Sequence, residues 1–176
     1  MLSFSQKSFQ SQLPLSDNEI WGVGMVACQW ASLEDILDHF IAFINEGPAL
    51  NSNGAPLSFS SRIKLLKQIL EGEVKEAAVR TDFVKVIDCI HSLQDERDRV
   101  VHHIWTNTTG KTTIFDWRSK NKKPSERTMD AGKLVQLARR IEGAKLAFYQ
   151  SLIKHGNVQP DQPIFETAWQ RITQQS

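Results

Sequence analysis

The spacing of apolar residues constrains the fold of this chain most strongly. In four long stretches these residues recur at steps of three and four positions, which places them on one face of an α-helix. The four series are Ile20, Val23, Ala27, Trp30, Leu37, Ile41 and Ile44; Phe59, Ile63, Leu66 and Leu70; Val79, Phe83, Val86, Ile90, Leu93, Val100 and Ile104; and Leu134, Leu137, Ile141, Ala144, Phe148 and Leu152. Four amphipathic helices with few strand signals predict an all-α fold built as a four-helix bundle.

Residues that start and stop helices set the expected boundaries. Ser16-Asp17-Asn18-Glu19 has the pattern of a capping box, in which Glu19 reaches back to the first residue. The four helices are predicted from Ser16 to Gly47-Pro48, from Ser58 to Leu70, from about Lys75 to Trp105, and from about Met129 to His155 with Gly156 as the stop. We expect one domain over residues 1–176, with a polar arm at 1–15 and a tail at 157–176 that contains a short helix from Ile164 to Ile172.

A β-hairpin is predicted between the third and fourth long helices. In the segment TNTTGKTTIFDW, residues 106–117, β-branched and aromatic residues flank Thr109-Gly110. The following segment RSKNKKPSER, from Arg118 to Arg127, is predicted to be a basic loop. Its residues Lys120, Lys122 and Lys123 are candidates for contacts with RNA phosphates, and an ordinary solvated loop is the alternative.

Composition excludes several classes of protein. With 176 residues, a net charge of +1 and 23% charged residues, the chain is neither intrinsically disordered nor a binder of nucleic acid through bulk charge. Cys28 and Cys89 lie far apart amid apolar residues, which predicts neither a zinc site nor a disulfide. The chain has no apolar run of signal-peptide length and no run of about 18 apolar residues. We therefore expect a soluble, cytoplasmic protein that needs no cofactor and contacts no membrane.

Two of the apolar series are interrupted by a charge. On the first helix the step between Trp30 and Leu37 falls on Glu34, and on the third helix the corresponding gap is filled by Arg97. Because an unpaired charge in a helical core is costly, we expect Glu34 and Arg97 to form an ion pair. Such a pair could hold a functional arginine, or it could serve only to fix the register of the helices.

A polar stripe lies beside this interruption on the third helix. His91, Asp95, Asp98 and His102 recur at steps of four, three and four, so that Asp98 can hydrogen-bond His102. Arg97 lies about 140° around the helix from His102, so we expect two copies of this helix to pair, with Arg97 of one copy beside His102 of the other. Imidazoles and guanidiniums together suit the cleavage of RNA through the 2′-hydroxyl.

At these residues the sequence resembles the HEPN superfamily. Its signature is R-x4-6-H near the end of a long helix in a helical bundle, and the matching stretch here is Arg97-Asp98-Arg99-Val100-Val101-His102. The resemblance implies a homodimeric, metal-independent endoribonuclease with Arg97 and His102 as catalytic residues and Asp98 in support. It also implies a role as a toxin, with an antitoxin protein as a further partner, or as an effector of antiviral defence.

Other residues near the motif have subsidiary roles in this interpretation. Glu34 would hold Arg97, and His103 would assist the chemistry or crowd the cleft. One subgroup of the superfamily has a tyrosine two residues after the histidine, and this chain has Ile104 there, so the resemblance does not extend to inactivation by nucleotide transfer to that tyrosine. Adjacent histidines on a helix diverge by about 100°, which argues against a metal held by His102 and His103.

The alternative function belongs to a different class of protein. It is a catalytically inactive, dimeric HEPN-like module that binds RNA, a nucleotide or a protein partner. The five tryptophans Trp21, Trp30, Trp105, Trp117 and Trp169 could stack on bases, although core packing is the simpler interpretation for most of them.

Overall fold

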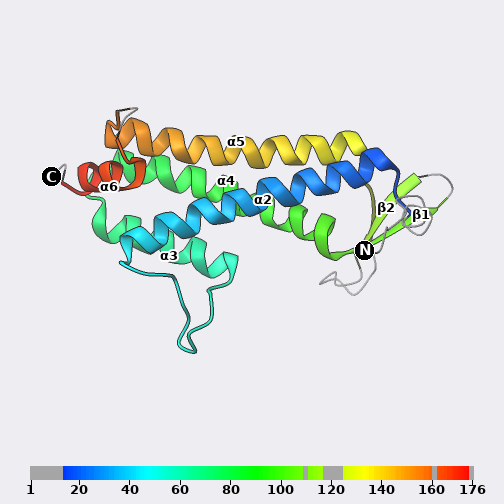
Figure 1. The fold of residues 1–176 in the computed structure, drawn as a ribbon, viewed down its shortest axis with the longest axis horizontal. Coiled ribbons are helices and arrows are strands. Elements are labelled where there is room, and N and C mark those ends of the chain that lie inside the picture. Colours follow the sequence, from blue (N-terminus) through cyan, green and yellow to red (C-terminus); the bar gives the residue numbers. More distant parts are fainter. Residues whose placement is uncertain (1–13, 109–110, 117–124, 160–161, 175–176) are drawn as a thin grey trace, which may run out of the picture. The chain divides into compact units, whose positions relative to one another are not determined.

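A computed structural model describes residues 14–108, 111–116, 125–159 and 162–174. This described part contains five helices and three strands (Figure 1). They are α2 (Asp17–Ile44), α3 (Phe59–Glu73), α4 (Ala77–His102), β1 (Ile104–Thr108), β2 (Lys111–Asp116), β3 (Ser125–Thr128), α5 (Ala131–Gly156) and α6 (Ile164–Gln174). The predicted mainly helical fold is confirmed for these residues, whereas the arrangement of the long helices as one four-helix bundle stays a prediction.

The chain divides into two compact units. We call the first the sheet unit (Met1–Trp30 and Gln94–Arg140) and the second the helical unit (Ala31–Leu93 and Ile141–Ser176). By residue range, helices α2, α4 and α5 each contribute residues to both units. The expectation of a single domain over residues 1–176 stays a prediction.

The capping box at the start of α2 is present as predicted. The Ser16 amide and hydroxyl donate to Glu19 Oε2 at 2.7 and 2.8 Å, and the Glu19 amide donates to Ser16 Oγ at 3.4 Å. Burial acts to raise the pKa of the Glu19 carboxyl, but hydrogen bonds from Ser16 and from the Thr112 side chain outweigh burial and hold that pKa below its usual range. Glu19 therefore links the first turn of α2 to strand β2 of the same unit.

The sheet is antiparallel, with the strand order β1-β2-β3. The predicted hairpin is confirmed in β1 and β2, whose register runs from Ile104 opposite Phe115 to Thr108 opposite Lys111. Ile114 of β2 is 2% exposed and anchors the sheet in the core. Ile104 belongs to β1 and is 55% exposed, so its assignment to the buried face of the third helix was wrong: the helix ends at His102, before that face reaches Ile104.

Strand β3 was missed in the sequence, where Arg118 to Arg127 was predicted to be a loop. Its residues pair with β2, from Thr113 opposite Thr128 to Asp116 opposite Ser125. The strand sequence SERT has no alternation of apolar and polar residues, and strand prediction depends on that alternation. Residues 117–124, which include Trp117, lie outside the described residues.

The helical unit is organised around three buried phenylalanines on three helices. Phe40 of α2 lies edge-on to Phe148 of α5, with 5.3 Å between the ring centroids, and Phe83 of α4 lies 6.2 Å from Phe148. Helix α6 covers this cluster through Phe165 and Trp169, whose rings lie 5.6 and 5.8 Å from Phe40. The apolar spacing in the sequence predicted all three phenylalanine-bearing helices, and Ile164 to Ile172 correctly marked α6.

Two helix ends depend on residues with positive φ. Glu46 (φ 54°) turns the chain after α2, and the Gly47 amide bonds back to the Ala42 carbonyl at 2.9 Å. Asn157 (φ 45°) turns the chain after α5. Gly156, predicted as the stop, has a different role: a Cβ there would lie 2.3 Å from Ala168 Cα, so glycine is needed for the close approach of α6.

Truncation of the central phenylalanine should strongly destabilise the fold. Phe148 is fully buried between two other rings, so Phe148→Ala is expected to lower the free energy of unfolding by about 3–5 kcal/mol. Leu146→Ala is the control on the same helix, because Leu146 is 51% exposed, and should change it by less than about 0.5 kcal/mol. Urea unfolding followed by circular dichroism measures both, and equal losses would contradict the described core.

The Glu19 cap should make stability depend on pH. Because the folded-state pKa is depressed, the contribution of Glu19 is present above its unfolded pKa of about 4.3 and is lost as pH falls through the folded pKa. Glu19→Gln is therefore expected to cost about 0.5–2 kcal/mol at neutral pH and progressively less below about pH 4. The measurement is urea unfolding across this range. Glu71→Gln, at an exposed position of α3, should show no such trend.

Candidate functional site

The candidate site is the C-terminal end of α4, in the sheet unit. Two hydrogen bonds fix the chain where the helix ends: Trp105 Nε1 donates to the Val100 carbonyl at 3.0 Å, and His103 Nδ1 lies 3.2 Å from the Asp98 carbonyl. The Trp105 bond satisfies the Val100 carbonyl, which is one of the last four carbonyls of the helix and has no intrahelical donor. The last turns of α4, which carry the RDRVVH motif, are therefore held in a defined conformation against the start of β1.

Arg97 lies on an aromatic platform. Its guanidinium carbon is 4.5 Å from the ring centroid of Trp30, a cation–π contact, and Trp30 is only 2% exposed. The Arg97 side chain is 14% exposed, and its Nη1 donates to Asp98 Oδ1 at 2.8 Å. The arginine is thus confined between a buried indole and a carboxylate, with part of its guanidinium reaching the surface.

His102 meets the same arginine. Its Nε2 lies 3.3 Å from Arg97 Nη1, and the His102 side chain is exposed. The guanidinium N–H can only donate, so Nε2 is the acceptor in this contact. An imidazole and a fixed positive charge therefore lie side by side, and Nε2 can take a proton from another group only when it moves off Arg97.

This geometry differs from the predicted one in two respects. We expected Asp98 to orient His102, but Arg97 lies between them and touches both. We also expected one chain alone to make an imperfect site because Arg97 must reach across about 140° to His102, yet its long side chain spans that separation within one chain. The spacing of Cα positions around a helix underestimated what a flexible arginine can span.

The predicted partner of Arg97, Glu34, belongs to the helical unit. There Glu34 Oε1 accepts from Arg62 Nη2 at 2.8 Å, and Arg62 also pairs with Asp38. The proposed ion pair of Glu34 with Arg97 would join the two units and stays a prediction. Sequence reasoning missed both Arg62 as a partner of Glu34 and Trp30 as a platform for Arg97.

The other predicted site residues are exposed, half-buried, or outside the described residues. His91 and Asp95 of the polar stripe are exposed, and beside them Glu96 pairs with Arg140 of α5 at 2.8 Å. His103 is half-buried and bonded to the end of α4. Lys120, Lys122 and Lys123 lie outside the described residues, so their contact with RNA stays a prediction.

Neither a metal site nor a membrane-spanning helix is found in the described part of the chain. No group of three or more His, Cys, Asp or Glu side chains there could hold a metal ion. Cys28 and Cys89 are free and exposed. Among the same residues, no helix combines the length and the apolar composition needed to cross a bilayer.

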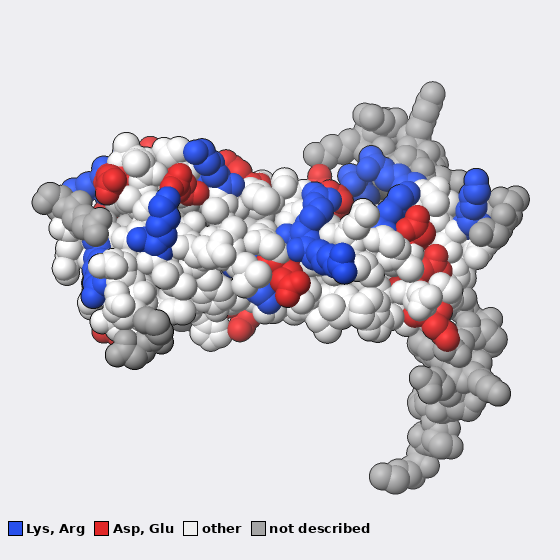
Figure 2. Space-filling model, turned by 90° about the horizontal axis from the view of Figure 1, so that it is seen from above, with Lys and Arg blue, Asp and Glu red and all other residues white. Residues whose placement is uncertain are grey.

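The charge of the chain is unevenly divided. The sheet unit has twelve Lys or Arg and eight Asp or Glu residues, a formal charge of +4, whereas the helical unit has nine and twelve, a charge of −3. On the face drawn in Figure 2, blue basic side chains lie in small groups, several of them next to red acidic ones, on a mainly white surface. Any attraction for an anionic partner therefore depends on particular side chains of the sheet unit.

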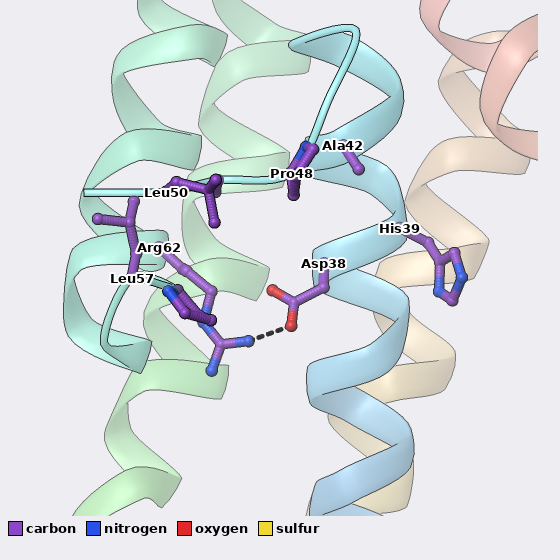
Figure 3. Close-up of a pocket in the computed structure, with 9 residues that line it drawn as sticks. Asp38, His39, Ala42, Pro48, Leu50, Leu57 and Arg62 are labelled. Carbon is purple, nitrogen blue, oxygen red and sulfur yellow. Dashed lines mark hydrogen bonds and ion pairs between the residues drawn. The ribbon is translucent and has the colours of Figure 1, made fainter. Parts of the chain in front are cut away.

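A cavity of about 280 Å³ lies in the helical unit, between α2, the loop after it and α3 (Figure 3). Its wall is mainly apolar and includes Pro48, Leu50 and Leu57. Figure 3 shows Arg62 and Asp38 facing each other across one side, where they form an ion pair. The same arginine also bonds Glu34, so two carboxylates of α2 balance its charge.

Comparison of the chain with protein-family models, with curated protein sequences and with solved structures finds no match.

Removal of the Arg97 charge should show how much the contacts of this side chain contribute to the stability of the fold. Arg97→Met keeps much of the length but loses the cation–π contact and leaves Asp98 without this donor, so the free energy of unfolding should fall by about 1–3 kcal/mol. Arg99→Met is the matched control two residues along the same helix. This substitution should lower the free energy of unfolding by less than about 0.5 kcal/mol. Similar losses in both variants, measured by urea unfolding, would contradict a special role for the Trp30 platform.

Proposed function

We propose that this protein is a metal-independent endoribonuclease of the HEPN type. The observation that carries the proposal is the 3.3 Å contact between Arg97 and His102 within the R-x4-H motif. A neutral imidazole and a fixed guanidinium are the groups that cleavage through the 2′-hydroxyl requires. The net charge of +4 on the unit that carries them supports an anionic substrate.

In the proposed reaction, His102 acts as an acid–base catalyst and Arg97 stabilises charge. The imidazole takes the proton of a ribose 2′-hydroxyl as its oxygen bonds to phosphorus, and the bond from phosphorus to the 5′-oxygen breaks. The departing 5′-oxygen receives a proton from an imidazolium, which leaves a 2′,3′-cyclic phosphate and a 5′-hydroxyl. Arg97 would stabilise the negative charge that grows on the non-bridging oxygens.

A homodimer follows from the requirement for two acid–base groups. The attacking and leaving oxygens lie on opposite sides of the phosphorus, so one imidazole is poorly placed to serve both at once. A second copy of α4 across a two-fold axis would supply the second His102. In this proposal each chain forms a four-helix HEPN-like bundle, with Glu34 and Asp98 holding Arg97, and with Lys120, Lys122 and Lys123 contacting RNA phosphates.

The cellular role is proposed from the same resemblance. A ribonuclease of this type would act in the cytoplasm, as a toxin restrained by an antitoxin protein or as an effector of antiviral defence. The second candidate function is an inactive HEPN-like module that binds RNA, a nucleotide or a protein. The contact of Arg97 Nη1 with Asp98 favours this alternative, because a guanidinium already paired with a carboxylate must be released or shared before it can bind a phosphate.

Replacement of His102 should separate the two functions. In EDTA, His102→Ala is expected to cut a mixed RNA at least about 100-fold more slowly than the unmodified protein, because general acid–base catalysis contributes about 100- to 10,000-fold. His91→Ala is the matched control, an exposed histidine on the same helix, and should retain full activity. Initial rates from electrophoresis of labelled RNA provide the measurement.

Two results would contradict the proposal. Equal cleavage by both variants would show that the activity comes from elsewhere. An absence of cleavage, together with RNA binding by the unmodified protein, would favour the inactive module.

A further inference from the structure

A hollow of about 430 Å³ lies in the sheet unit, away from the end of α4 in the sequence. It is lined by residues from the first turns of α2 and of α5: Asn18, Trp21, Ala131, Gly132, Val135, Gln136 and Arg139. All of these residues belong to the sheet unit. The volume falls within the range of about 300–1,000 Å³ that is usual for ligand sites. None of these residues belongs to the Arg97–His102 site.

Trp21 stands apart from the other tryptophans that the structure describes. Its side chain is 58% exposed, whereas Trp30 is buried under Arg97, Trp105 bonds the Val100 carbonyl and Trp169 packs on Phe40. The buried positions of this part of α2 include Glu19 and Val26, and Trp21 lies on the exposed side of the helix. Within the described residues its indole takes part in no hydrogen bond or ring contact. Its exposed indole therefore offers an aromatic face on which a planar ligand could stack.

The polar side chains that line the hollow are also available to bind a ligand. Asn18 lies one turn before Trp21 on α2, and Gln136 and Arg139 lie one turn apart on α5. In the part of the chain that the structure describes, none of these three side chains makes a hydrogen bond or an ion pair. Side-chain amides both donate and accept, and a guanidinium pairs with phosphate oxygens.

We infer that this hollow binds one unpaired base of a single-stranded RNA, with the base stacked on Trp21 and its neighbouring phosphate on Arg139. The amides of Asn18 and Gln136 would bond the edge of the base. Stacking on an aromatic side chain, together with a cation for the backbone, is the usual way in which single-stranded nucleic acid is held. Arg139 is the charged residue of the lining, and its guanidinium favours this anionic partner over a neutral apolar peptide.

The position of the phosphate follows from the charges on α5. The first turn of this helix is already capped by Asp130, whose Oδ1 accepts from the Lys133 amide at 2.9 Å. That carboxylate repels a phosphate from the start of the helix. Arg139 lies two turns further along, and it supplies the cation at the other end of the hollow.

The inference deepens the proposed function by naming a subsite for its substrate, but binding at Trp21 does not require cleavage. The test therefore uses the full chain with His102→Ala, so that bound RNA stays intact. Fluorescence anisotropy of a short labelled single-stranded RNA gives the affinity. Trp21→Ala should weaken binding by about 5- to 100-fold, whereas Trp21→Phe, which keeps an aromatic face, should stay within about threefold.

A second pair of variants tests the phosphate contact. Arg139→Gln should weaken binding and reduce the slope of log affinity against log salt by about 1. Lys64→Gln removes one charge from an exposed position of α3 in the helical unit and should change neither quantity. Thermal unfolding should show all four variants folded like the parent, because each substitution is at an exposed or lining position.

The outcomes are distinguishable from those of the cleavage test. Unchanged RNA affinity in Trp21→Ala, or an absence of RNA binding, would overturn the inference. A peptide would then be the alternative ligand for the hollow. Equal loss in Arg139→Gln and Lys64→Gln would overturn the phosphate assignment. If the unmodified protein fails to cut RNA but binds it through Trp21, the ribonuclease proposal fails while the Trp21 subsite stands.

Discussion

The contact of the Arg97 guanidinium with the buried face of Trp30 is the interaction on which the rest of the site depends. It allows a permanently charged side chain to occupy a position that the helix spacing assigns to the core. From that position the Nη1 nitrogen of Arg97 contacts both Asp98 and His102. An arginine free in solvent would sample many conformations, and the ordered contact removes most of that entropic cost before a substrate arrives.

The surrounding elements keep this end of α4 in place. The chain leaves the helix directly into β1, and hydrogen bonds from His103 and Trp105 return to the last turns. The sheet is tied in turn to α2 through Glu19 and Thr112. Trp30, which lies on α2, and Arg97, which lies on α4, thus belong to one unit held by both packing and polar links. The β1–β2 hairpin therefore helps to hold the end of α4 in place, in addition to connecting α4 to the following elements.

Sequence patterns predicted the helices well, because apolar spacing and capping residues act locally. The same patterns correctly marked the capping box at Ser16 and the strands around Thr109-Gly110. They could not give strand β3, whose polar residues carry no alternation, or the reach of the Arg97 side chain, which depends on rotamers rather than on helix geometry. They identified Trp30 and Arg97 as interior positions, but only the packing of α2 against α4 brings the two together.

The most direct test of the account is the chemistry of the cut made by the unmodified protein in EDTA. An RNA with one preferred cleavage position would be compared with the same RNA carrying a single 2′-deoxynucleotide there, and the product ends would be identified by mass spectrometry. The account predicts 2′,3′-cyclic phosphate ends on the first RNA and no cleavage at the deoxy position of the second. Cleavage at the deoxy position, ends with a 5′-phosphate, or no cleavage of either RNA would contradict it.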